Sequence, residues 1–126
     1  MTLVARINDL AAAIRDKFNA LPRGIGLHCA GSPAANEVIG GQISPYAFTI
    51  TTGNCVAKAL TAATAITIIT VKKNGTSVGT VTFGAGSTTG TFNFTDATVA
   101  VGDQITFHAP ATPDTTLANI DIIVRK

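Results

Sequence analysis

The side chains best suited to acid–base chemistry are seven carboxylates and two histidines. The carboxylates are Asp9, Asp16, Glu37, Asp96, Asp103, Asp114 and Asp121. A glycosidase places two carboxylates across one cleft, and a serine hydrolase of the α/β type holds its nucleophile on a Gly-x-Ser-x-Gly turn. The sequence has no such turn to accompany His28 or His108. Asp96, Asp103 and Asp114 fall at apparent turns, where Asp usually accepts hydrogen bonds from backbone N–H groups. We therefore expect no catalytic residues, and a small hydrolase using Asp103 or Asp114 is the alternative.

The same side chains give no pattern for a metal or a cofactor. The turn acids lack the Asp-x-Asp run of a calcium loop, and neither Cys29 nor Cys55 belongs to a Cys-x-x-Cys pair. The glycine-rich segment 84–87 precedes neither a helix pattern nor a lysine, so it does not predict a phosphate site. We expect two buried thiols, and one disulfide between Cys29 and Cys55 is the alternative.

Charge and composition exclude further classes of function. The net charge is only +2, and the basic doublets Lys72–Lys73 and Arg125–Lys126 do not form a stripe that could follow phosphates, so we expect no nucleic-acid partner. No apolar stretch approaches 18 residues, so we expect no membrane insertion. Charged residues are 13% of the chain, about half of the usual 25%. Threonine, serine, asparagine and glycine supply the polarity instead, which is typical of an extracellular-type β protein or a shell component.

The strongest structural signal is a hairpin around Asn74–Gly75, because that pair suits the two positive φ angles of a type I′ turn. Straight pairing would place apolar residues on both faces of the hairpin. A β-bulge at Gly79 would instead turn one apolar set to a single face, and we favour the bulge. The set is Ile69, Val71, Val78, Val81 and Phe83.

Beyond the hairpin, residues 38–126 read as short strands separated by turn signals, which indicates a sandwich or a barrel. We favour an antiparallel β-sandwich of jelly-roll or Ig-like type. We expect residues 23–37 to be a linker, because glycine, proline and alanine dominate them, and an extended crossing segment is the alternative. Residues 55–65 are expected to be a loop with a short strand. The predicted inward-facing residues are Phe48, Ile50, Ile69, Val71, Val81, Phe83, Phe92, Phe94, Ile105, Phe107, Ile120, Ile122 and Val124.

Residues 1–22 are expected to form an N-terminal oligomerisation helix. The helical pattern itself covers residues 2–21, and it carries an apolar seam with heptad-like spacing. The seam, which is the predicted oligomer interface, consists of Leu3, Ile7, Leu10, Ile14, Phe18 and Leu21. A lone helix of about 20 residues is marginal in water, so the seam must be covered. A coiled coil between copies is favoured over docking on the chain's own domain. Val4 and Ala11 widen the seam, and a wider apolar face is compatible with three strands as well as two.

Two regions resemble proteins of tailed bacteriophages. Segment 3–22 resembles the opening helix of many phage fibre and minor tail proteins. Segments 71–83, 90–92, 101–103 and 109–120 are similar to a β-domain of phage tail and virion proteins. The resemblance implies a virion-surface protein, commonly a homotrimer, that is assembled in the host cytoplasm and bound to other tail or capsid proteins. It brings no catalytic residues.

These observations predict a short, non-enzymatic, oligomeric appendage of the phage particle, such as a tail fibre, a head fibre or a capsid decoration protein. The chain is short for a host-recognising fibre, which favours a small appendage or an adaptor subunit. The alternative is a module that binds a host receptor or glycan through loops around 84–90 and 112–116. The absence of tryptophan and the single tyrosine, Tyr46, weaken a sugar-binding role.

Overall fold

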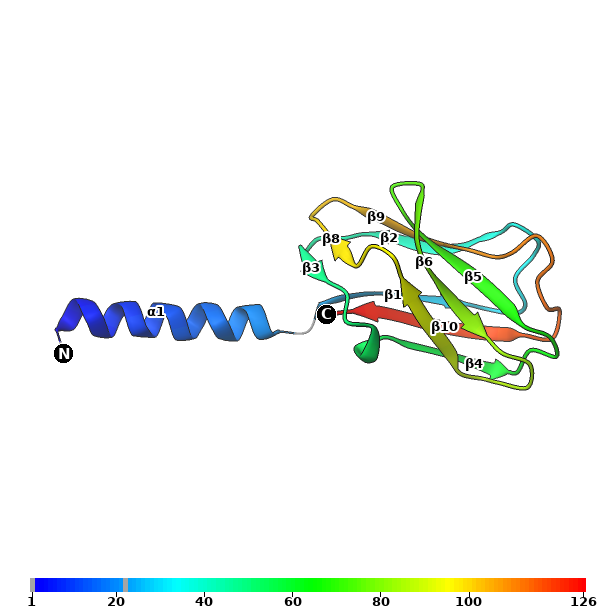
Figure 1. Ribbon diagram of the computed structural model, residues 1–126, viewed down its shortest axis with the longest axis horizontal. Coiled ribbons are helices and arrows are strands. Elements are labelled where there is room, and N and C mark those ends of the chain that lie inside the picture. Colours follow the sequence, from blue (N-terminus) through cyan, green and yellow to red (C-terminus); the bar gives the residue numbers. More distant parts are fainter. Residues whose placement is uncertain (1, 22) are drawn as a thin grey trace.

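A computed structural model describes residues 2–21 and 23–126, apart from the side chain of Asn19. The fold is mainly β, with one helix at the N-terminus, as the sequence predicted (Figure 1). Helix α1 spans Leu3–Ala20 and projects from one end of the β-domain. The remaining elements are β1 (Gly24–Cys29), β2 (Val38–Ile43), β3 (Phe48–Thr49), the short 3-10 helix Thr52–Asn54, β4 (Val56–Thr61), β5 (Thr67–Lys73), β6 (Thr76–Phe83), β7 (Gly90–Phe94), β8 (Thr98–Val99), β9 (Gln104–His108) and β10 (Ala118–Arg125).

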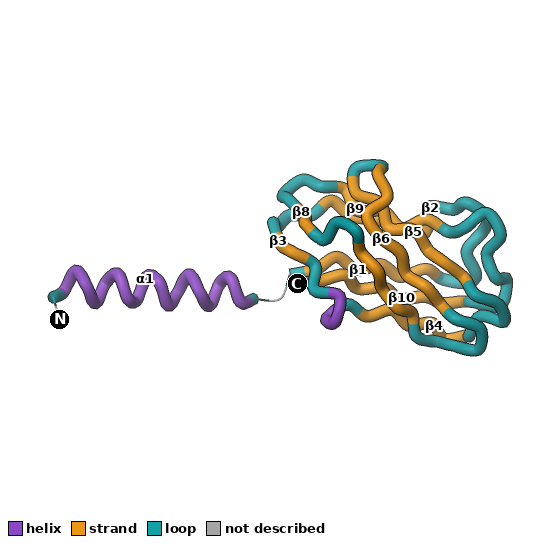
Figure 2. Tube along the Cα trace, in the orientation of Figure 1, coloured by secondary structure: helices purple, strands orange, loops and turns teal. Residues whose placement is uncertain are grey.

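The strands form two main antiparallel sheets and a small third one. The order is β1–β10–β4 in the first sheet, β2–β9–β5–β6–β7 in the second, and β3–β8 in the third. The two larger sheets face each other (Figure 2), and side chains from both join one apolar core. Ile25 and Ile122 enter the core from the three-stranded sheet, and Val71, Phe83 and Phe107 enter it from the five-stranded sheet.

The pairing of the strands is nested around the β5–β6 hairpin. On either side of this hairpin, β3 pairs with β8, β2 with β9 and β1 with β10, and a single bridge between Lys58 and Thr89 joins β4 to the start of β7. The chain is therefore one long antiparallel ribbon, folded over so that β10 also pairs with β4, β9 with β5, and β6 with β7.

The predicted bulge in the central hairpin is confirmed. Lys73 pairs with Thr76, but Val71 pairs with Gly79, so one residue of β6 is extra and the register shifts. The carbonyl oxygen of Val78, which the bulge turns out of the ladder, accepts a hydrogen bond from Thr95 N at 2.9 Å. All five residues of the expected inward set are buried: Ile69, Val71, Val78, Val81 and Phe83.

The predicted core is confirmed except at β7. Phe92 and Phe94 are half-buried and lie at the margin of the core, with their ring centroids 6.1 Å apart. The other inward-facing residues are buried, namely Phe48, Ile50, Ile69, Val71, Val81, Phe83, Ile105, Phe107, Ile120, Ile122 and Val124. The structure adds Leu117, which is fully buried in the loop before β10.

Residues 23–37 contain a strand, so the prediction of a linker was wrong for residues 24–29, and the alternative of an extended segment is nearer to the structure. Strand β1 pairs with β10, and Ile25 is only 1% exposed opposite Val124. Its alternation was hidden because Gly24 and Gly26 occupy outward positions where a strand usually shows polar side chains. The β-domain therefore begins at Gly24 and not at residue 38. Segment 55–65 likewise holds a full strand, β4, whose inward residues are alanines.

Candidate oligomer interface

Helix α1 has a capped N-terminus and a short connection to the β-domain. The hydroxyl of Thr2 accepts a hydrogen bond from Ala5 N at 3.1 Å, which caps the first turn. Helical hydrogen bonding ends at Leu21, whose N–H donates to Phe18 O at 3.2 Å. Met1 and Pro22, the limits of the predicted oligomerisation segment, lie outside the described residues.

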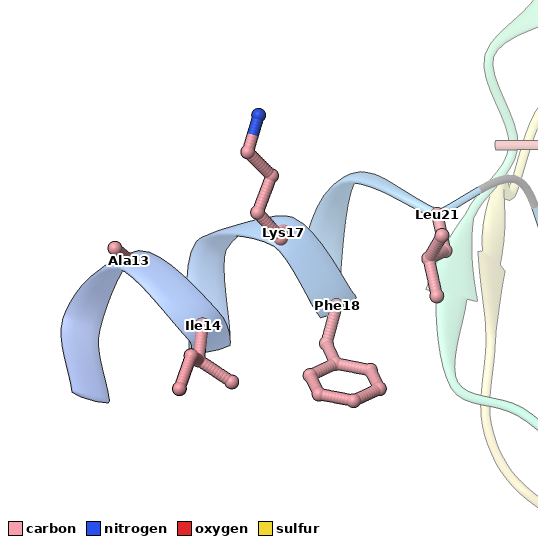
Figure 3. Close-up of a pocket in the computed structure, with 5 residues that line it drawn as sticks. All are labelled: Ala13, Ile14, Lys17, Phe18 and Leu21. Atoms are coloured by element: carbon pink, nitrogen blue, oxygen red, sulfur yellow. The ribbon is translucent and has the colours of Figure 1, made fainter. Parts of the chain in front are cut away.

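The predicted seam is exposed along the whole helix. The exposed fractions are 73% for Leu3, 55% for Ile7, 61% for Leu10, 48% for Ile14, 61% for Phe18 and 52% for Leu21. At about 100° per residue these side chains, with Val4, gather within one side of the helix. Figure 3 shows Ile14, Phe18 and Leu21 pointing the same way, with Lys17 pointing away. Ala13 and Lys17 also line this shallow surface, beside Ile14, Phe18 and Leu21.

The seam does not lie against the chain's own domain. Helix α1 points away from the sheets, and only its C-terminal end is near them (Figures 1 and 2). Docking on the same chain, the alternative considered for the seam, is therefore not the arrangement found. A continuous apolar side on a helix in water is a surface that another molecule is expected to cover.

Arg23 fixes the joint between the helix and the β-domain. Its guanidinium donates to Ala47 O at 3.2 Å and to Phe18 O at 3.4 Å, and it lies 5.7 Å from the ring centroid of Tyr46. Tyr46 is 50% exposed beside this arginine. The joint could not be predicted from the sequence, because Ala47 and Tyr46 come from the distant turn between β2 and β3.

Asp114 organises the loops at the end of the β-domain opposite the helix. One carboxylate oxygen accepts hydrogen bonds from Thr64 N at 3.0 Å and Ala65 N at 2.7 Å, and the other accepts from Thr116 N at 2.8 Å and Leu117 N at 3.2 Å. Hydrogen bonds from Thr116 and Thr64 hold the pKa of Asp114 well below its usual range. Both oxygens are thus occupied by donors of the fold itself.

Asp103 serves the turn between β8 and β9. Its carboxylate accepts from Ala100 N and from the Asn74 side chain, each at 2.8 Å, and these bonds lower its pKa. Asp96 accepts from Thr98 N at 2.9 Å and pairs with Lys73, and the Lys73 hydrogen bond is the largest cause of its lowered pKa. The prediction that the three turn acids cap backbone N–H groups is confirmed.

The two histidines lie on different sheets. His28 Nδ1 of β1 is 2.7 Å from the Asp121 carboxylate on the neighbouring strand, and both side chains are exposed. His108 Nε2 of β9 is 2.9 Å from Thr106 Oγ1, and burial, with a smaller effect of the Lys72 charge, lowers its pKa. Among the described residues, no three His, Cys, Asp or Glu side chains gather as a metal site would require.

The two cysteines are both free. Cys29 is buried in the core and Cys55 is half-buried, and burial is the largest cause of the raised pKa of each thiol. The expectation of unpaired thiols is thus confirmed, although Cys55 is less buried than predicted.

Loops 84–90 and 112–116, considered for receptor binding, meet at the end of the β-domain away from the helix. Gly86 N donates to Ala63 O at 2.7 Å, and Ala65 N donates to the Asp114 carboxylate at 2.7 Å, so both loops attach to the turn between β4 and β5. Glu37 O accepts from Ala109 N at 2.8 Å, which adds the loop before β2 to the same group.

Comparison with known proteins found no matching family model, no matching curated protein and no matching solved structure. Within the described residues, no helix is both long and apolar enough to cross a membrane.

Proposed function

We propose that this chain is a short, non-enzymatic structural component of a tailed-phage particle, which self-associates through the seam of α1 and displays its β-domain at the surface. A tail fibre, a head fibre and a capsid decoration protein all fit this description. The observation that carries the proposal is the exposed seam on a helix that stands clear of its own domain.

The energetics of the helix favour a shared seam. A helix of this length is marginal alone in water, and each large apolar side chain gains about 1.5–3 kcal/mol when it moves from full exposure to full burial. The seam residues are 48–73% exposed, so much of that gain is still available to association. Val4, 67% exposed, widens the seam beyond a strict two-stranded pattern, which favours a trimer in this proposal.

The β-domain fits a jelly-roll sandwich better than an Ig-like one. Nested pairing around a central hairpin is what a jelly roll requires, since that fold is a single antiparallel ribbon wrapped over itself. Jelly rolls occur in viral capsid proteins and in lectins, so this part of the support is analogy between folds.

The turn acids also favour a structural role. Asp103 and Asp114, the residues of the hydrolase alternative, accept hydrogen bonds from the loops they hold, and their pKa values are lowered. A general acid in a glycosidase needs a raised pKa instead. We therefore favour the structural assignment over the hydrolase.

Sedimentation velocity over a micromolar concentration range tests the self-association. Wild-type protein should sediment as an oligomer. Ile14→Asp, which places a charge in the seam, should shift it to monomer. Ala12→Asp is the matched control, because two residues correspond to about 200° around the helix and the same charge then faces away. A monomeric wild type, or equal effects of the two variants, would contradict the proposal. Imaging of particles with and without the protein then tests its place on the virion.

A host-receptor or glycan-binding module is the second candidate. The observation that favours it is the hydrogen-bonded group of loops at the end opposite the helix, which in an assembly would face outward. A glycan array and a host-cell adsorption assay test this directly. Absence of signal in both assays would remove the receptor role and leave the structural role unchanged.

A further inference from the structure

The outer face of the three-stranded sheet carries an apolar row that no predicted site included. Gly26 of β1 pairs with Ile123 of β10, which pairs with Val56 of β4, so the three residues lie side by side across the sheet. Ile123 is 44% exposed and Val56 is 39% exposed. The next row along the strands is ionic: Asp121 pairs with His28 on one side and Lys58 on the other. The face therefore has an apolar centre with a charged border, the usual anatomy of an interface.

Gly26 leaves room that its own chain does not use. A Cβ atom there would lie 3.6 Å from Ile122 O and 3.6 Å from Ile123 Cγ1, which is ordinary contact, and its backbone is outside the left-handed region. A larger residue would therefore fit in the isolated domain. Gly24 differs, because a Cβ there would lie 2.7 Å from Arg125 Cβ. The missing side chain at Gly26 exposes flat backbone beside Ile123, which permits close approach by another surface.

The connection between the helix and β1 is short, and this limits which surfaces of two β-domains can meet when their helices associate. Leu21 is the last seam residue and Gly24 is the first residue of β1, so at most about 11 Å, three Cα–Cα steps, separates them. Packed helices lie about 8–10 Å apart, whereas a domain of this size has a radius of gyration of about 13 Å. Lys126 N donates to Arg23 O at 2.8 Å, which holds the end of β10 at the same place. Copies joined at the seam must therefore bring the β1–β10 ends of their domains together.

We propose that the outer face of the three-stranded sheet, centred on Gly26, Ile123 and Val56, packs against a second copy of this chain and continues the helix seam into the β-domain. This inference rests on the proposed self-association of α1. The outer face of the five-stranded sheet is a poorer candidate, because threonines dominate its central strands and because it does not contain the strand that follows the helix. The occupant is a copy and not an unrelated partner, since the tether brings copies to this face at high local concentration.

Two isoleucines provide a matched test in the full-length protein. Ile123 and Ile68 are 44% and 43% exposed, each lies within a strand, and they belong to different sheets. Ile123→Lys should raise the dissociation constant of the oligomer, measured by sedimentation equilibrium, by at least tenfold. Ile68→Lys should change it less than about twofold. Equal dissociation constants for the two variants would overturn the inference.

Cross-linking gives a second measurement, which does not require the fold to accept a lysine in the sheet. Gly26→Cys should form covalent dimers with a short bismaleimide, well above the wild-type background from half-buried Cys55, whereas Ile68→Cys should not. Equal yields from the two variants would overturn the inference. If wild-type protein is an oligomer while both tests fail, only the sheet contact is wrong. If wild-type protein is a monomer, the proposed function is wrong as well.

Discussion

Replacing Gly79 by alanine tests the central bulge, on which the single apolar face of the hairpin depends. A Cβ atom at Gly79 would lie 2.5 Å from Phe94 Cδ1 and 2.6 Å from Asn93 O. The second atom belongs to the backbone of the paired strand β7, so it cannot move away without disturbing the ladder. Overpacking of this kind costs about 1–3 kcal/mol, and we expect Gly79→Ala to lower the free energy of unfolding by that amount.

Gly84→Ala is the matched control. Nothing lies within 4 Å of a Cβ atom at Gly84, and its backbone is outside the left-handed region. The same change there should stabilise the fold by about 0.4–1 kcal/mol, because alanine reduces the freedom of the unfolded chain. The two variants therefore differ in sign although they add the same methyl group.

Urea unfolding at one fixed protein concentration measures both variants, and the fixed concentration keeps self-association from changing the comparison. In thermal unfolding, each kcal/mol should move the midpoint by about 4–8 °C for a domain of roughly this size. If Gly79→Ala were as stable as Gly84→Ala, the close approach of β7 at the bulge would be refuted, and with it the account of how the hairpin hides its apolar side chains.

Three further predictions concern the loops, the core and the thiols. Folding lowers the pKa of Asp114 from its unfolded value of about 3.9. The ionised carboxylate therefore stabilises the fold fully above that pH, and this contribution is lost as the pH falls through the folded pKa. In urea unfolding, Asp114→Asn should be less stable than wild type at pH 7, with a smaller difference at pH 3. Phe107→Ala, at a fully buried site, should cost about 3–5 kcal/mol of unfolding free energy. Phe18→Ala on the exposed helix should act on the β-domain only through the oligomer, so in urea unfolding at the same protein concentration it should cost much less than Phe107→Ala. A thiol reagent should modify half-buried Cys55 in the native protein and buried Cys29 only on unfolding, and equal native rates would contradict the assigned burial.

Local chemistry explains which parts of the fold were predictable. Asn74 and Gly75 have positive φ angles of 51° and 85°, as the turn signal required, and the excess of apolar residues on both faces of the hairpin indicated the bulge. The helix was predictable because its apolar period is uninterrupted. Strand β1 was missed, because its outward glycines removed the polar half of the alternation on which a strand prediction depends.

The parts of the structure that could not be predicted depend on pairing between segments that are distant in the sequence. The row formed by Gly26, Val56 and Ile123 comes from three segments that are far apart in the sequence, and only the register of β1, β10 and β4 brings them together. The joint at Arg23 depends in the same way on a turn more than twenty residues away. Periodicity within one segment carries no information about such neighbours, so the predicted interface contained the helix seam but not the sheet face that we propose as its continuation.

The nested ribbon gives the molecule two different ends. Its two termini, the start of β1 and the end of β10, meet where the helix leaves, so the proposed helix seam and the proposed sheet contact both lie toward this end (Figure 1). The loops before β2, β5, β7 and β10 are tied to one another by hydrogen bonds at the other end, far from the helix. A surface appendage needs one end that assembles and one that is displayed. Since the ribbon places the helix and the outward loops at opposite ends, changes in the loops leave the assembling end untouched, and this separation is why the structural role and the receptor role can be tested independently.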